Sequence, residues 1–291
     1  MSDMADPRAV SVSVLKGGVG KSTIAINLTR ELAERGHEAL LVDLDPNGHA
    51  TMGLGLTEAY KRDVHLGNVV LDDRTATLED VIVETEFGFD VLPSSESLER
   101  VERELSNVMR GSSRVRKFVI DPLLGEQYDY IVTDSPANRG RLSDNALVGT
   151  LNMIIPLIPG NESLGGLQRT IERQIKPLRE YEALEILAIV PNMLEDRIDQ
   201  QTGDRILLEE LNAREGLQQY VPNFATFSTE EFEAIDAGEL KPLPKPGIRD
   251  RKAFTKGIGE NKPLRDFDPE NDQLKHFAEL AKIVEQGGIH R

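Results

Sequence analysis

A glycine-rich segment close to the N-terminus has the residue types that hold the phosphates of a nucleoside triphosphate. Residues 16–23 read Lys-Gly-Gly-Val-Gly-Lys-Ser-Thr. Glycines in such a loop let backbone N–H groups come close to phosphate oxygens. The residues expected to surround the phosphates are therefore Gly17, Gly18, Val19, Gly20, Lys21, Ser22 and Thr23.

Three side chains of this segment have separate expected roles. Lys21 should reach the β- and γ-phosphates, Ser22 should ligate Mg²⁺, and Thr23 should hydrogen-bond an inner phosphate. The alternative interpretation is a glycine-rich turn in which the lysines are incidental. The segments on either side of the loop decide between the two.

Those flanking segments predict a strand before the loop and a helix after it. Residues 10–15 form an apolar run, and Ile24, Leu28 and Leu32 recur with the spacing of four that suits one face of a helix. The N-terminus of that helix adds partial positive charge where the phosphates would lie. The order of strand, glycine loop and helix favours the nucleotide site over the turn.

The loop departs from the general P-loop pattern at its first position. That pattern has a glycine five residues before Gly20, where this chain has Leu15, and a second lysine, Lys16, follows directly. This deviant form resembles the P-loop of the ParA/MinD family of ATPases. The resemblance implies that ATP is the nucleotide and that Lys16 crosses a dimer interface to touch the phosphates of the partner's ATP.

Two carboxylates end the second strand-like segment, at residues 38–45. Side chains alternate along a strand, so Asp43 and Asp45 are expected on the same side. By the resemblance, Asp45 positions or polarises the attacking water, while Asp43 supports the Mg²⁺ shell. The alternative is a polar strand end before a proline turn. His49, in the loop that follows, is expected to be an ordinary loop residue.

A third acid, Asp134, ends the apolar segment at residues 128–134. An acid at the C-terminal end of a parallel strand beside a P-loop can hold Mg²⁺ through a water molecule, as the Walker B aspartate does, and we assign that role to Asp134. The next loop resembles the family's switch loop in an altered form. Its Arg139 and Arg141 could contact a partner subunit, the phosphate or DNA, or lie in a solvated turn.

Asn192 directly follows the strand-like segment at residues 185–190 and Pro191. The family has an asparagine at this place whose side-chain amide reads the edge of the adenine base. The resemblance therefore assigns adenine recognition to Asn192. An asparagine that only closes a strand is the alternative.

Composition limits the classes of protein that fit. A chain of 291 residues suits one large α/β domain better than two small ones, so residues 1–291 are expected to form a single ParA-like domain. The absence of cysteine excludes disulfides, zinc–thiolate sites and iron–sulfur clusters. No apolar run reaches the length of a membrane span and no signal peptide is recognisable, so we expect a cytoplasmic protein without stable membrane insertion.

Strand-like and helix-like segments alternate along the chain. This pattern predicts an α/β fold with a doubly wound, mostly parallel sheet of the P-loop NTPase type and helices on both faces. Strands are expected at residues 10–15, 38–45, 89–93, 128–134, 151–159 and 185–190. Helices are expected after the glycine loop, briefly from residue 78, at 95–109, from about 162 to 181, and at 271–285.

The charge distribution changes sign late in the chain. The formal net charge of −16 argues against a large DNA-binding face. Residues 195–239 are strongly acidic, whereas residues 241–256 are basic, and the two parts form an insertion-like stretch at about 195–256. Residues 223–247, which include several prolines, are expected to form an extended linker.

The basic part of this stretch resembles the C-terminal segment that faces DNA in the family. The resemblance assigns DNA contacts to Arg249, Arg251, Lys252 and Lys256. A local basic cluster can hold phosphates even on an acidic protein. A solvated basic loop is the alternative.

The resemblance implies a cycle of ATP binding and hydrolysis with Lys16, Lys21 and Asp45 as the catalytic residues. Two ATP·Mg²⁺-bound monomers would form a homodimer, bind double-stranded DNA of the nucleoid without sequence preference, and hydrolyse ATP when a centromere-binding or cargo adaptor protein stimulates them. The residues do not identify the cargo.

Two other functions remain open. The first is a MinD-like or cargo-positioning ATPase that acts on a membrane or a protein array, although the tail at residues 284–291 is too short and too poor in apolar and basic groups for a membrane-binding helix. The second is a small-molecule ATP-dependent ligase similar to dethiobiotin synthetase. The second lysine of the loop is evidence against this alternative.

Overall fold

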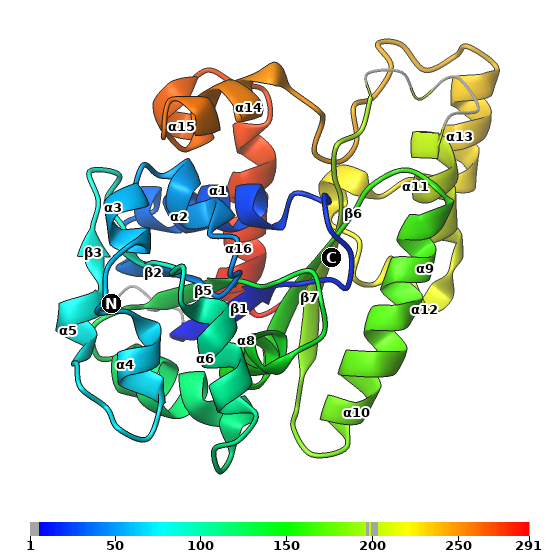
Figure 1. Cartoon of the computed structure of the whole chain (residues 1–291). Coiled ribbons are helices and arrows are strands. Elements are labelled where there is room, and N and C mark those ends of the chain that lie inside the picture. Colours follow the sequence, from blue (N-terminus) through cyan, green and yellow to red (C-terminus); the bar gives the residue numbers. More distant parts are fainter. Residues whose placement is uncertain (1–5, 196–197, 199–202, 291) are drawn as a thin grey trace.

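A seven-stranded sheet forms the centre of the structure (Figure 1). The structure, a computed structural model, describes residues 6–195, 198 and 203–290. The strands lie in the order β3-β4-β2-β5-β1-β6-β7, and every neighbouring pair is parallel except β3 and β4. The predicted α/β class and mostly parallel sheet are confirmed. The strands are β1 (Arg8–Val12), β2 (Ala39–Asp43), β3 (Val83–Glu84), β4 (Asp90–Leu92), β5 (Tyr130–Asp134), β6 (Asn152–Leu157) and β7 (Glu185–Pro191).

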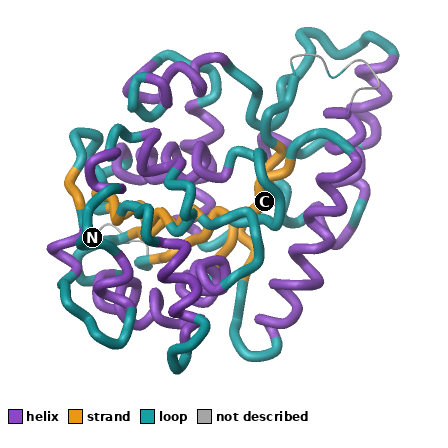
Figure 2. The backbone as a smooth tube through the Cα atoms, in the orientation of Figure 1, coloured by secondary structure: helices purple, strands orange, loops and turns teal. Residues whose placement is uncertain are grey.

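Helices connect the strands and cover both faces of the sheet (Figure 2). In the view of Figure 1, α1 and α2 lie above the sheet, and α4 and α6 lie below it. The α-helices are α1 (Lys21–Glu34), α2 (His49–Gly53), α3 (Thr57–Tyr60), α4 (Leu66–Val70), α5 (Leu78–Val81), α6 (Leu98–Leu105), α7 (Asp121–Leu123), α8 (Arg141–Thr150), α9 (Asn161–Thr170), α10 (Lys176–Arg179), α11 (Gly203–Ala213), α12 (Glu215–Gln218), α13 (Thr229–Asp236), α14 (Lys252–Gly259), α15 (Leu264–Phe267) and α16 (Leu274–Gln286). Short 3₁₀ or π turns are η1 (Gly111–Ser113), η2 (Arg116–Ile120), η3 (Ile171–Ile175) and η4 (Asn223–Ala225).

Two apolar cores lie on opposite faces of the central strands. Successive residues of β2 point to different cores, with Leu41 packed in the core of α1 and α16 and Leu40 and Val42 packed in the core of α4, α6 and α8. Because both faces of the strand are buried, its sequence is an uninterrupted apolar run. A third core surrounds β6 and β7 and includes residues of α9, α11 and α13. The central strands, including β1 from which the glycine-rich loop leaves, are therefore packed on both faces.

The prediction of an extended linker at residues 223–247 is wrong for the first half of that segment. Residues 223–247 include η4 and α13, and α13 begins with a capping box. The Ser228 hydroxyl accepts a hydrogen bond from the Glu231 N–H at 3.2 Å, and the Glu231 carboxylate accepts one from the Ser228 N–H at 2.8 Å. Phe232 and Ile235 pack into the third core. The capping pattern and these two apolar residues were the local signals that outweigh the prolines further on.

Other predicted elements differ from the structure in their bounds or lie partly outside the described residues. The helix expected at residues 95–109 is shorter, because α6 ends at Leu105, and β2 ends at Asp43 rather than at residue 45. The acidic part of the insertion-like stretch includes residues 196–197 and 199–202, which lie outside the described residues. Within the described part of the chain, none of the helices has the length and apolar character needed to cross a membrane.

Candidate functional site

The glycine-rich loop runs from the end of β1 into α1, as predicted. Gly18 and Gly20 have φ angles of 69° and 83°, in the left-handed region that favours glycine. Gly20 has no room for a side chain either, because a Cβ atom there would lie 2.4 Å from Nδ2 of Asn192. Both the backbone conformation and the space around it therefore require glycine at this position.

The loop borders a cavity of about 390 Å³, which is within the size range of small-molecule sites. Besides the loop, its lining includes residues that follow β2 in the chain and are distant from the loop in the sequence. The lining residues are Gly17, Gly18, Val19, Gly20, Lys21, Ser22, Thr23, Asp45, Asn47, His49, Ala137, Met193 and Ile258. The predicted phosphate-binding residues and Asp45 thus come together in one place.

Lys21 is buried at the base of this cavity, with only 7% of its surface exposed. Its Nζ donates a hydrogen bond of 3.1 Å to the backbone carbonyl of Lys16. Burial lowers the pKa of the Lys21 ammonium, while the nearby carboxylates of Asp134 and Asp45 act in the opposite direction. A positive charge held between two acids and the loop is well placed to meet phosphate oxygens.

Asp43 is fully buried at the end of β2 and accepts several hydrogen bonds. Its Oδ2 accepts from the backbone N–H and the hydroxyl of Thr51 at 2.9 and 2.7 Å, and its Oδ1 accepts from the backbone N–H of Asp45 at 3.1 Å. Burial outweighs these bonds and raises the pKa of Asp43 to about 6. Asp43 therefore holds the following turn in place, whether or not it also supports Mg²⁺.

Asp45 lies in the loop beyond β2, so strand alternation does not set its direction. Its Oδ1 accepts hydrogen bonds from the backbone N–H and the side-chain amide of Asn47 at 3.0 and 2.9 Å. Asp45 and Asn47 both line the cavity. The carboxylate is thereby held at the cavity by Asn47, and its predicted catalytic role stays a prediction.

Asp134 ends β5 directly beside Asp43, its register partner on β2. It has no exposed surface, and neither carboxylate oxygen has a donor in normal hydrogen-bond geometry among the described residues. Burial, followed by repulsion from Asp43, raises the pKa of Asp134 well above its usual value, whereas the Ser22 hydroxyl, as a weak donor to the carboxylate, and the positive charge of Lys21 act in the opposite direction. Buried carboxylates in native proteins normally have donors, so a missing donor at this position requires an explanation.

A hydrated Mg²⁺ ion would supply the missing donors and positive charge. Mg²⁺ prefers oxygen ligands and keeps several of its waters in phosphate sites, so an acid can hold it through water. The residues that fit this group are Ser22, through its hydroxyl, and Asp134, through its unsatisfied oxygens. The donor set suits the predicted magnesium site.

Asp134→Asn tests whether this carboxylate is kept for metal binding at a cost to stability. The pKa of Asp134 is raised in the folded state, so its contribution to stability is present near pH 4 and is lost as pH rises through that raised pKa. Without nucleotide, the variant should gain about 1–3 kcal/mol at pH 8 and should show a weaker decline of stability with pH. Chemical denaturation at several pH values measures both. A variant less stable than wild type at pH 8 would contradict the assignment.

Asn192 contacts the loop from the end of β7. Its side-chain amide donates a hydrogen bond of 2.8 Å to the Val19 carbonyl, and its backbone N–H bonds to the Leu157 carbonyl at 2.7 Å. Asn192 is nearly buried, with 5% of its surface exposed. The structure thus shows that Asn192 braces the P-loop, while its predicted contact with adenine stays a prediction.

Three apolar residues of the cavity, Ala137, Met193 and Ile258, were not predicted from the sequence. His49 was expected to be an ordinary loop residue, but it begins α2 and lines the cavity. Met193 follows Asn192 with a left-handed backbone, φ 55°, and its position after a predicted ligand was the only available signal. Ile258 comes from α14, and a Cβ atom on Gly53 of α2 would lie 3.5 Å from it. No local pattern links α14 to the loop, because that contact arises only from folding. The side chains of Met193 and Ile258 make part of the cavity lining apolar.

The predicted DNA-binding residues do not share one environment. The prediction that Arg249 contacts DNA is wrong for this conformation. Arg249 is only 1% exposed, so its guanidinium cannot reach a duplex. Arg251 is partly buried and forms an ion pair with Asp272 at 2.8 Å. Lys252 and Lys256 are exposed on α14. The candidate surface is therefore smaller than predicted and is centred on α14.

Arg139, in the loop after Asp134, and Arg141, the first residue of α8, are not among the residues that line the nucleotide cavity. Arg139 and Arg141 line a separate hollow of about 180 Å³ that also contains Asp144 and Arg173. Arg139 is exposed, and Arg141 lies 3.7 Å from the Asp144 carboxylate. The structure does not bring either residue to the phosphates of its own chain.

Comparison with known proteins identifies the family of this chain. Residues 7–186 match the model of a family described as an AAA domain, AAA_31. The sporulation initiation inhibitor protein Soj of Bacillus subtilis (strain 168) is 34% identical over 282 residues, which cover 97% of this chain and 99% of Soj.

Two solved structures are similar in fold. The ATP complex of a variant of McdA from Cyanothece has a TM-score of 0.70 and 19% identity, and the match covers 99% of both chains. Cobyrinic acid a,c-diamide synthase from Mycobacterium smegmatis, solved with an ATP analogue and magnesium, has a TM-score of 0.67 and 24% identity over 83% of this chain and 99% of that chain. At these identities the likeness extends to the fold alone.

The matched residues include the P-loop and the aspartates at the ends of β2 and β5, and the match to Soj extends over almost the whole chain. Chromosome partitioning protein ParA of Caulobacter vibrioides (strain NA1000 / CB15N) is 36% identical over 194 residues, which cover 65% of this chain and 71% of that protein. The chain belongs to the ParA/Soj type of partition ATPase, within the ParA/MinD family of deviant P-loop ATPases.

Proposed function

We propose that this protein hydrolyses ATP to partition or position a cargo, and that it does so as an ATP-dependent homodimer bound to DNA. The observation that carries the proposal is that Lys21 and Asp45 line one cavity, while the buried Asp134 lies close enough to Lys21 to act on its charge. In the reaction, Lys21 binds the phosphates, Asp45 orients the attacking water, and Asp134 and Ser22 hold Mg²⁺. When bound, the metal neutralises phosphate charge.

The position of Lys16 supports a dimer. The residues that line the cavity of the same chain do not include Lys16. Its side chain instead runs beside α9, because a Cβ atom on Gly166 would lie 3.5 Å from Lys16 Cβ and 3.6 Å from its Cδ. A partly exposed lysine beside its own site can extend toward the phosphates of a second subunit.

Two of the predicted DNA-binding residues, Lys252 and Lys256, are exposed on α14 and support DNA binding through this helix. One chain offers few phosphate contacts there, and the net charge of −16 opposes binding. Dimerisation doubles the number of contacts, and affinity depends steeply on that number and on salt. We therefore propose sequence-independent binding to duplex DNA of the nucleoid, with an adaptor protein that stimulates hydrolysis and releases the dimer.

The double variant Lys252→Ala/Lys256→Ala tests the DNA surface. It should lower affinity for a duplex at least tenfold at low salt in the presence of a non-hydrolysable ATP analogue, because the dimer loses four phosphate contacts. The salt dependence of the remaining binding should be shallower. Fluorescence anisotropy at several salt concentrations measures both quantities.

Lys61→Ala/Lys176→Ala is the matched control, since it removes the same charge from two exposed positions on other elements. It should bind DNA like wild type. If both double variants lost affinity equally, binding would reflect overall charge and not the α14 surface. If the wild type did not bind DNA at all, a positioning role on a protein array or a membrane would become the better account.

The fold likeness to cobyrinic acid a,c-diamide synthase keeps a small-molecule ligase as the second candidate. The two functions differ in what stimulates ATP turnover. A partition ATPase should respond to DNA and its adaptor, whereas a ligase should require a small acid and an amine donor. ATP turnover measured with each addition separates them.

A further inference from the structure

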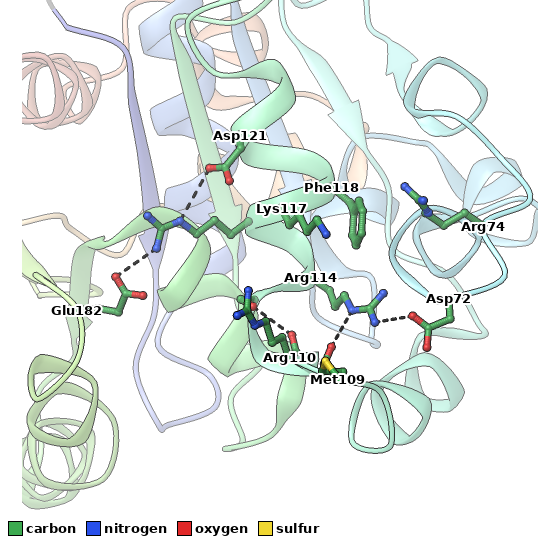
Figure 3. Close-up of a pocket in the computed structure, with 11 residues that line it drawn as sticks. Asp72, Arg74, Met109, Arg110, Arg114, Lys117, Phe118, Asp121 and Glu182 are labelled. Atoms are coloured by element: carbon green, nitrogen blue, oxygen red, sulfur yellow. Dashed lines mark hydrogen bonds and ion pairs between the residues drawn. The ribbon is translucent and has the colours of Figure 1, made fainter.

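A second cavity, of about 700 Å³, lies away from the nucleotide site, and the two cavities share no lining residue. Residues 109–121 supply most of its lining, Asp72 and Arg74 come from the loop after α4, and Glu182 precedes β7 (Figure 3). None of these residues belongs to the predicted ATP, metal or DNA sites. The cavity therefore lacks a function in the proposed ATPase cycle.

Three positively charged side chains lie around the ring of Phe118 in this cavity. The distances from the centre of its ring are 4.7 Å to Cζ of Arg74, 5.0 Å to Nζ of Lys117 and 5.5 Å to Cζ of Arg114. Figure 3 shows the Phe118 ring between Lys117 and Arg74, with Arg114 close by. Cation–π contacts hold long side chains in place, so the aromatic ring concentrates positive charge where flexible side chains would otherwise spread apart.

Only some of the cations in the cavity have carboxylate partners. Arg114 pairs with Asp72, and Arg116 pairs with Glu182 at 3.2 Å. Among the described residues, no carboxylate lies within ion-pair distance of the remaining three cations, which are Arg74, Arg110 and Lys117. On a protein of net charge −16, a cluster of unpaired cations is a local exception that suits an anion.

The carboxylates limit the size of that anion. In Figure 3, Asp121 and Glu182 lie on one side of the cationic group and Asp72 lies on the other. An extended polyanion would meet these acids at both ends, whereas a compact anion would meet only the cations between them. Arginine forks match phosphate geometry, and several cations favour a group with several charges.

The backbone that carries these residues is anchored to α8. Asn145 donates hydrogen bonds of 2.7 Å to the carbonyls of Gly111 and Arg141, and its Oδ1 accepts one of 2.9 Å from the N–H of Val115. The cavity wall between Arg110 and Lys117 is thus tied to a buried helix. A fixed wall reduces the entropy cost of binding.

We propose that this cavity is a second anion site, which binds a small molecule with two or more linked phosphates through Arg74, Arg110 and Lys117. The shared chemistry is a short phosphate chain, and its source is either free polyphosphate or a nucleoside polyphosphate. Inorganic tripolyphosphate is the minimal probe for both sources.

A tryptophan reporter distinguishes this site from the P-loop. The chain has no tryptophan, so Phe118→Trp places a single fluorophore in the cavity and keeps an aromatic face for the cations. Titration with tripolyphosphate should change its fluorescence in a saturable way. Arg74→Gln/Lys117→Gln in the same background should weaken the affinity at least tenfold, whereas the exposed control pair Lys61→Gln/Arg62→Gln should leave it unchanged.

Each result of this experiment bears on the proposal. Guanosine triphosphate that binds more tightly than tripolyphosphate supports a nucleoside source, and equal affinities support free polyphosphate. The proposal fails if fluorescence does not change, if Arg74→Gln/Lys117→Gln binds like its parent, or if a 20-base-pair duplex binds more tightly than either probe, since the cavity would then be a nucleic-acid surface. If Phe118→Trp does not fold, calorimetry of wild type against Arg74→Gln/Lys117→Gln gives the same comparison.

Discussion

Lys21→Ala should abolish measurable ATP binding. Lys21 is the lysine within the loop that is buried beside the nucleotide cavity, where Asp134 and Asp45 act on its charge. Its removal deletes charge-assisted hydrogen bonds of about 1.5–3 kcal/mol each and leaves two acids facing the phosphates. The expected loss of affinity is at least about a hundredfold. Isothermal titration calorimetry with ATP and Mg²⁺ measures it.

Lys16→Ala is the control for this experiment, because it removes a lysine from the same loop outside the cavity. Its ATP affinity at low protein concentration should stay close to that of wild type. Circular dichroism should confirm that both variants fold. Near-normal ATP binding by Lys21→Ala would show that the P-loop assignment is wrong.

Asp45→Ala should bind ATP and Mg²⁺ but remain trapped as a dimer. The substitution removes the carboxylate that orients water and leaves the loop, Lys21 and Asp134 intact. General-base catalysis typically contributes about 10²–10⁴ to a rate, so ATP turnover should fall by that order. Light scattering with ATP should show a dimer that persists for longer than the wild-type dimer.

Lys16→Ala should behave in the opposite way in the same measurement. It should bind ATP as a monomer, because the bond that it is proposed to make reaches the second subunit. Asp45→Asn is a further control, since an amide keeps the contacts with Asn47 but cannot accept a proton from water. Equal dimerisation of Asp45→Ala and Lys16→Ala would overturn the role proposed for Lys16.

The core of the fold could be predicted from the sequence because its signals are local. β1, the glycine loop and α1 are contiguous, and the apolar runs of β2 and β5 directly reflect burial on both faces of a parallel sheet. The ends of the helices and strands were predicted less accurately than their order. Asp45 lies outside β2, because the pairing of β2 with β5 stops at Asp43, so strand alternation does not relate the two aspartates. Local apolar character does not show where a strand stops pairing with its neighbour.

The late part of the chain could be predicted only in part. The basic composition at residues 241–256 does not distinguish a surface cation from a buried one. Arg249 is enclosed between segments from different parts of the fold, and its backbone N–H bonds to the Gln273 side chain at 2.7 Å. Charge is a property of the sequence, but its exposure depends on what packs over it.

The sequence by itself determined the expected phosphate chemistry of this protein, because the eight consecutive residues 16–23 form the loop and its chemistry lies in their own side chains and backbone. The tertiary structure alone decided which groups surround that loop. It set Asp134 beside Asp43 without a donor in normal hydrogen-bond geometry among the described residues, brought Asn192 against Val19, and placed Ile258 on the cavity wall. It also assembled the second cavity around Phe118. These contacts join residues far apart in the chain, and only the packing of helices on both faces of the sheet brings them together.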